Sequence, residues 1–141
     1  MKVSVANRVM AKGVDALIVF FVAVVLIYPL GPLCGFLYSI LSDGFAFGPF
    51  HGQSLGKKLM GLQVRSTSRK RPANWMDSAV RNTPVGIATF FGIIPIWGWL
   101  VLILVGIPLM IMEVYLMITI ESGHRLGDVM ADTEVVEVKK Q

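Results

Sequence analysis

The segment from 16 to 42 reads ALIVFFVAVVLIYPLGPLCGFLYSILS and contains no charged residue. A second stretch, from 82 to 120, reads NTPVGIATFFGIIPIWGWLVLILVGIPLMIMEVYLMITI and contains only one, Glu113. One helical crossing of a bilayer needs about 20 apolar residues, so stretches of 27 and 39 residues are too long for a single crossing. Pro29 and Pro95 interrupt them. We therefore expect each stretch to form a hairpin of two transmembrane helices.

The composition favours a membrane protein over a soluble one. The chain has 141 residues, of which 55% are hydrophobic and 16% are charged, whereas about a quarter of the residues in ordinary soluble domains are charged. A cleaved signal peptide does not explain the pattern, because the apolar character continues far beyond the first segment. The single cysteine, Cys34, excludes an internal disulfide and is expected in helix packing.

These patterns predict an all-α membrane protein, a four-helix transmembrane bundle of two tandem hairpins with a short cytoplasmic β-strand after each hairpin. Asn74 is the expected N-cap of the third helix, with Asp77 three residues later. The expected helices span about 4–28, 33–50, 74–94 and 99–120, and the expected strands span 62–66 and 133–138. We interpret 1–141 as one domain, composed of hairpin unit 1–66, basic cytoplasmic linker 67–73 and hairpin unit 74–138.

The basic residues indicate the orientation. All 13 Lys and Arg residues lie in the tails, in the central loop or at the adjoining helix ends, and none lies in either predicted outer turn. The positive-inside rule then places both termini and the linker in the cytoplasm. Residues 69–71 read RKR, which suits attraction to anionic lipid better than a nucleic-acid site.

The chain also contains an internal repeat. GQSLGKKLMGLQV at 52–64 resembles GHRLGDVMADTEV at 123–135, an offset of 71 positions. Gly52 and Gly56 thereby correspond to Gly123 and Gly127. Each segment follows a predicted hairpin, so we expect two parallel copies of one unit. In this interpretation Arg8 and Arg81 are also equivalent, although their offset is 73.

These motifs resemble the RDD family of small bacterial membrane proteins, which is named for an arginine and two aspartates. The residues that carry the resemblance are Arg8, Asp15, Gly52, Gln53, Ser54, Gly56, Lys57, Arg81, Asp128, Ala131 and Thr133. The resemblance covers nearly the whole chain and implies a multi-pass protein of the bacterial inner membrane. Some members of the family are described as sodium–proton antiporters. Asp43 and Glu113 are not part of the family pattern.

Three carboxylates lie within or beside the apolar stretches, where a charge is costly. They are Asp15, Asp43 and Glu113. Two interpretations remain open. In one, Arg8, Lys12 and Arg81 pair with these carboxylates and lock helix packing, with Lys12 bound directly to Asp15. In the other, Asp15 and Glu113, with Asp43 as a possible third member, form an inward-opening site that exchanges a proton for a small cation. Arg8, Arg81 and Asp128 are further candidates for the ion pathway or for buried ion pairs.

The sequence contains no motif that pairs a nucleophile with a base and no cofactor fingerprint, so we expect a non-enzyme without a cofactor. His51 and His124 lack partners at ligand spacing, and no metal site is expected. The leading hypothesis is proton-coupled movement of a small cation or solute, in a homo-oligomer or a larger membrane complex. The alternative is an accessory or scaffold subunit that binds a protein partner or anionic lipid.

Overall fold

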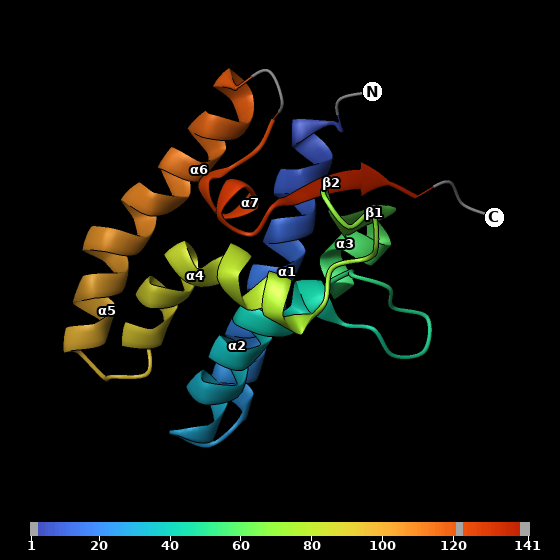
Figure 1. The fold of residues 1–141 in the computed structure, drawn as a ribbon. Coiled ribbons are helices and arrows are strands. Elements are labelled where there is room, and N and C mark those ends of the chain that lie inside the picture. Colours follow the sequence, from blue (N-terminus) through green and yellow to red (C-terminus); the bar gives the residue numbers. More distant parts are fainter. Residues whose placement is uncertain (1–2, 121–122, 139–141) are drawn as a thin grey trace.

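A computed structural model describes residues 3–120 and 123–138 and shows a mostly helical chain with one small sheet (Figure 1). The helices and strands are α1 (Val5–Val25), α2 (Leu30–Leu41), the 3-10 turn η1 (Ser42–Gly44), α3 (Leu55–Leu59), β1 (Leu62–Ser66), α4 (Trp75–Phe91), α5 (Trp97–Val101), the π-helical turn η2 (Leu102–Gly106), α6 (Ile107–Thr119), α7 (Leu126–Met130) and β2 (Thr133–Glu137).

The first hairpin is shorter than expected. Helix α2 begins at Leu30 and ends at Leu41, so the prediction of a helix over 33–50 was wrong at both ends. The chain leaves the helix through η1, where a side chain on Gly44 would collide with the backbone of Asn74. Gly35 brings α2 close to α1, because an added Cβ would lie 3.1 Å from the Val19 side chain.

The second hairpin begins with the expected cap. Asn74 accepts a hydrogen bond from the Asp77 N–H, and the Asp77 carboxylate accepts one from the Asn74 N–H, which confirms the predicted N-terminus of α4. The next helix begins at Trp97, two residues before the predicted start. It continues through η2 into α6, and the π-helical turn ends two residues before Pro108, which has no N–H to donate.

The two short strands lie close to the predicted spans and form one antiparallel pair. Val64 lies opposite Val135 and Ser66 lies opposite Thr133. Each strand follows a five-residue helix, α3 before β1 and α7 before β2. The sheet therefore joins the segments that follow the two hairpins.

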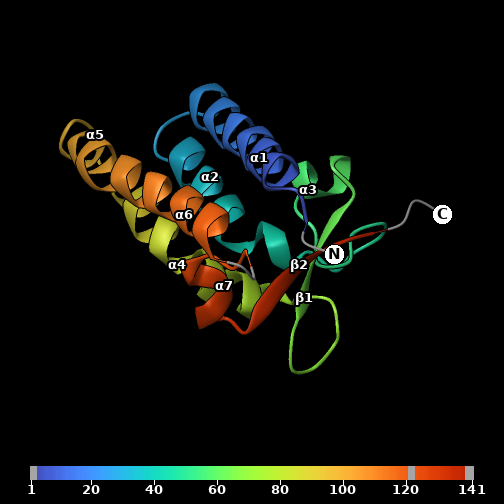
Figure 2. The ribbon, with the colours of Figure 1, turned by 90° about the horizontal axis from the view of Figure 1, so that it is seen from above.

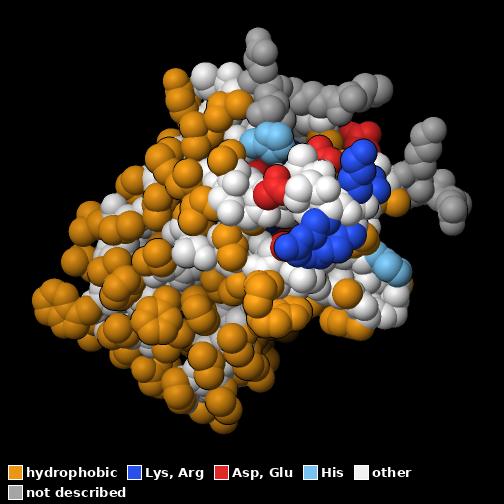
Figure 3. Space-filling view, viewed as in Figure 1, with side chains coloured by type: hydrophobic (Ala, Val, Ile, Leu, Met, Phe, Trp, Pro, Cys, Tyr) orange, Lys and Arg blue, Asp and Glu red, His pale blue; other side chains and the backbone are white. Residues whose placement is uncertain are grey.

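The fold has a polar interior and an apolar exterior. Among the described residues, buried polar and charged side chains outnumber buried apolar ones, while Ile27, Phe20 and Trp97 are 84%, 67% and 75% exposed. Figure 3 shows hydrophobic side chains over α5, α6 and the lower part of the molecule, whereas charged side chains gather toward β1 and β2. The hydrophobic effect in water would not favour this distribution.

The helices pack in sequence order, with α2 between α1 and α4, and α4 against η2 and α6 (Figure 2). Both hairpin turns lie at one end of the molecule, and the sheet lies toward the other end (Figure 1). Within the described ranges, only the continuous helix Trp97–Thr119 is both long and apolar enough to cross a membrane by itself. Helix α1 is 21 residues long but contains Arg8, Lys12 and Asp15.

Candidate functional site

Charged side chains from both halves of the chain meet in the interior, where the hairpins approach the sheet. We call this group the charge cluster. Its members come from α1, η1, α3, α4, α6 and the start of α7. They are Arg8, Lys12, Asp43, Lys57, Arg81, Glu113, Arg125 and Asp128.

The Asp128 carboxylate contacts arginines from three elements. Its carboxylate lies 2.7 Å from Arg8 Nη2 and 2.9 Å from Arg81 Nη2, and it also accepts from the Arg125 backbone N–H. Burial alone raises the pKa of the Asp128 carboxyl, but the three arginines together hold that pKa well below its usual range. Asp128 is thus an anion that links α1, α4 and α7.

Asp43 links the first hairpin to the second. It forms ion pairs with Lys57 Nζ and, at 3.3 Å, with Arg81 Nε, and it accepts a hydrogen bond from Asn82 Nδ2 at 3.3 Å. Burial raises the pKa of the Asp43 carboxyl, yet Lys57 and Arg81 outweigh burial and lower that pKa below its usual range. The charge of Asp43 is thereby compensated from α3 and α4.

Lys57 is a buried cluster member whose pKa lies near neutral pH. Burial lowers the pKa of its ammonium group to about 7, and repulsion from Arg81 and Arg125 acts in the same direction. Attraction to Asp43 opposes the shift without cancelling it. Lys57 can therefore gain or lose a proton without leaving the interior.

Arg125 and Asn82 are the central residues that the sequence analysis missed. Arg125 lies 3.1 Å from Glu113 Oε2 and 3.4 Å from an oxygen of Asp128, and its Nη2 donates to Asn82 Oδ1 at 3.2 Å. Burial lowers the pKa of Arg125, but Asp128 and Glu113 outweigh burial and raise it. The only sequence signal for Arg125 is its alignment with Ser54 in the internal repeat.

Asp15 occupies a separate position outside the ion-pair network. Its carboxylate accepts hydrogen bonds from Tyr38 Oη at 2.8 Å, Ser54 Oγ at 2.6 Å and the Gly56 N–H at 2.9 Å. The expected contact with Lys12 is absent from the ion pairs of the described residues, because neutral donors from α2 and α3 surround this carboxylate. No described hydrogen bond or ion pair joins Asp15 to Glu113.

The GQSLGK segment positions α3 against α1. Gly52 has φ +70°, Gln53 donates to the Leu62 carbonyl at 2.9 Å, and Ser54 caps α3 by accepting from the Lys57 N–H. A Cβ on Gly56 would collide with the Ala11 carbonyl of α1. Close contact between the two backbones therefore requires glycine at position 56.

The second segment docks on α4 in a similar way. Gly123 has φ +67°, and its carbonyl accepts a hydrogen bond from Arg8 Nη1. A Cβ on Gly127 would collide with the Arg81 carbonyl. By this contact Arg81 of α4 holds a place similar to that of Ala11 of α1.

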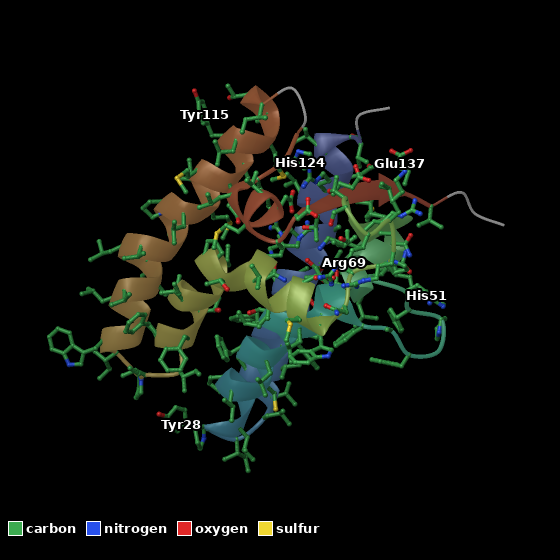
Figure 4. All side chains as sticks on the ribbon, viewed as in Figure 1. Tyr28, His51, Arg69, Tyr115, His124 and Glu137 are labelled. Atoms are coloured by element: carbon green, nitrogen blue, oxygen red, sulfur yellow. The ribbon has the colours of Figure 1, made fainter. Side chains whose placement is uncertain are left out.

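The histidines lie at the polar end of the molecule. Figure 4 shows His51, Arg69, His124 and Glu137 toward the end that carries the sheet, whereas Tyr28 lies at the turn of the first hairpin. Among the described residues, no group of three or more His, Cys, Asp or Glu side chains could hold a metal ion.

Comparison with known proteins identifies one family. The profile of the RDD family matches residues 2–132, which is nearly the whole chain. No curated protein and no solved structure matches the chain. The matched span contains Arg8, Asp15 and Asp128. The chain therefore belongs to the RDD family.

Proposed function

We propose that this chain is a multi-pass protein of the bacterial inner membrane in which α1 with α2, and α4 with α5–α6, form two membrane-spanning hairpins. Both termini and the linker 67–73 would face the cytoplasm. Two observations support this arrangement. The hairpin turns lie at the same end of the molecule (Figure 1), and large apolar side chains cover its outer surface (Figure 3). Contact between this apolar surface and lipid is favourable, and charged side chains are then best placed in the interior of the protein.

We also propose that the two hairpin units derive from a duplication. The similar docking of Gly56 on Ala11 and of Gly127 on Arg81 supports it, as does the pairing of β1 with β2. Four short spanning segments enclose little space, so a homo-oligomer or a complex with other subunits would complete any pathway.

Within this protein we infer that the charge cluster exchanges protons and thereby couples proton movement to the movement of a small ion or solute. The observation that carries this proposal is Lys57, a buried ammonium group with a pKa of about 7 in contact with Asp43. A group that titrates near the working pH is suited to proton transfer. Glu113 lies inside α6, and Arg125 joins it to the same cluster.

The test is flux in proteoliposomes that contain the purified chain alone, with an imposed pH gradient. We expect proton flux from the wild type and a loss of at least about tenfold in Lys57→Met and Glu113→Gln. Glu137→Gln is the matched control, since Glu137 is exposed on β2 and should retain wild-type flux. Wild-type flux in both cluster variants would contradict the proposal.

The second candidate is a non-enzymatic accessory or scaffold subunit. It is favoured by the pairing of all three cluster carboxylates with cations, which suits a structural clamp as well as a pathway. Anionic lipid would contact the linker, where Arg71 is paired with Asp77 at 2.9 Å but Arg69 and Lys70 are exposed. Stable copurification with a larger complex, together with no flux from the chain alone, would favour this role.

A further inference from the structure

The loop between η1 and α3 exposes aromatic side chains outside the helices. Residues 45–51 read FAFGPFH, and we call them the aromatic loop. The rings of Phe45, Phe47 and Phe50 form one cluster, with centroids 5.1 Å apart for Phe45 and Phe47 and 5.6 Å apart for Phe47 and Phe50. Phe47 nevertheless remains 61% exposed. Clustered rings that still face outward indicate a surface that another apolar medium covers.

The aromatic loop lies where the hairpins meet the polar end of the molecule. Figure 1 shows it projecting sideways from the end of α2, between the level of the sheet and the level of the hairpin turns. Tyr38 of α2 contacts Phe45, with ring centroids 6.0 Å apart. Trp75 at the start of α4 is also exposed, and its backbone lies against Gly44, which immediately precedes the loop. The ring cluster therefore continues the apolar outer surface of the hairpins.

Lys58 of α3 provides a cation beside the rings. Its Nζ lies 4.3 Å from the centroid of the Phe50 ring and donates a hydrogen bond to the Pro49 carbonyl at 2.9 Å. The ion pairs between described residues do not include Lys58. A lysine whose ammonium group lies at the edge of an apolar surface suits the boundary between acyl chains and anionic headgroups.

The backbone of the aromatic loop limits how deep the loop can lie in a membrane. The Phe50 N–H donates to the Phe47 carbonyl at 3.1 Å, the Gly52 N–H donates to the Phe45 carbonyl at 2.8 Å, and Pro49 has no N–H. Within the described ranges, the N–H groups of residues 46–48 donate no hydrogen bond. Unpaired donors are costly in hydrocarbon, but they can bind water at the membrane surface. The loop therefore suits the interface and not the bilayer core.

We infer that the aromatic loop is a lipid anchor, which inserts Phe47 and the neighbouring rings into the interface of the cytoplasmic leaflet and places Lys58 near anionic headgroups. This inference rests on the proposed membrane arrangement and adds a lipid contact outside the spanning segments. A protein occupant is less favoured, because residues 46–49 carry no polar side chain for specific recognition. Since the loop connects Asp43 to Lys57, the anchor would hold this ion pair of the charge cluster close to the membrane surface.

The experiment places a nitroxide label at position 47 of the full chain in vesicles of phosphatidylcholine and phosphatidylglycerol. Phe47→Cys is made together with Cys34→Ala, since Cys34 is the single cysteine. Electron paramagnetic resonance measures collisions of the label with oxygen, which concentrates in lipid, and with a neutral nickel chelate, which stays in water. We expect the oxygen-to-nickel collision ratio at position 47 to exceed that at position 137 by about threefold or more. Glu137→Cys is the control, because Glu137 is exposed at the polar end (Figure 4).

The collision rates at position 47 separate three environments. A high oxygen-to-nickel ratio would support the lipid anchor. A ratio equal to that of Glu137→Cys would place the loop in water and overturn the inference. Low collision rates with both reagents would show that a second copy of the chain or another protein covers the rings, which would also overturn it.

A label on α1 separates failure of the anchor from failure of the proposed membrane arrangement. Phe20→Cys labels an exposed position within the first proposed spanning helix. A high ratio at position 20 with a low ratio at position 47 would retain the spanning hairpins and remove only the anchor. Ratios as low as that of Glu137→Cys at both positions would contradict the membrane arrangement together with the anchor.

Discussion

Asp128→Asn should destabilise the fold by about 3 to 5 kcal/mol, the usual effect of removing one partner from a buried ion pair. The Asp128 side chain is fully buried, and its oxygens lie 2.7 Å from Arg8 and 2.9 Å from Arg81. The amide keeps the shape but removes the charge, and its NH2 group would face a guanidinium. Because domains are stable by about 5 to 15 kcal/mol in total, this change removes a large share of that stability.

The assay is equilibrium unfolding of the purified protein in mixed micelles of a mild and a denaturing detergent. Asp132→Asn provides the matched control. It makes the same chemical change four residues later, at an exposed position where the carboxylate accepts one hydrogen bond from the Ser68 N–H. We expect the control to change the free energy of unfolding by less than about 1 kcal/mol. If both variants lowered the free energy of unfolding by the same small amount, the view that Asp128 neutralises the arginines would be refuted.

Two further predictions concern α3. Gly56→Val should destabilise the protein by about 3 kcal/mol or more, because the valine side chain would collide with the Ala11 carbonyl. An unfolding temperature equal to that of the wild type would exclude the close packing of α3 against α1. The free energy of unfolding should rise with pH between about 7 and 10.5, since in this range the unfolded chain binds a proton at Lys57 and the folded chain does not. Lys57→Met should remove this part of the slope, and an identical pH profile in the variant would contradict the lowered pKa.

The sequence predicted helices near 4–28, 74–94 and 99–120 and the two short strands because these depend on local patterns. Long apolar stretches, prolines between them, the Asn74 capping box and alternating valines each act over a few residues. The end of α2 was not predictable in this way. Beyond that end, Gly44 lies against the backbone at Asn74, a contact between residues that are 30 positions apart.

The candidate site was predictable only in part. Asp15, Asp43 and Glu113 were predicted because a charge beside an apolar stretch needs a partner, and Arg8, Arg81 and Asp128 were predicted from the family pattern. The structure brings all of these except Asp15 into one cluster. The partners within the cluster depend on how the helices pack, which periodicity does not encode. For this reason Lys12 was wrongly paired with Asp15.

Arg125 was missed because it follows the apolar stretch and resembled a residue that merely marks the polar side of the membrane. Its place beside Glu113 requires the chain to turn back after α6, so that α7 reaches α4. Tyr38 was missed for a related reason. A tyrosine in an apolar helix is common, and only the docking of α3 shows that its hydroxyl group binds Asp15.

The pairing of β1 with β2 has a consequence for biosynthesis. When a ribosome has completed the first hairpin and β1, strand β2 has not yet been made. Asp128, the ion-pair partner of Arg8, also lies 120 positions later in the chain and is not yet present. The early helices are therefore made before the charge of Arg8 is compensated. Nascent chains truncated before Thr133 should expose β1 as an unpaired edge, a form that quality-control proteases can recognise.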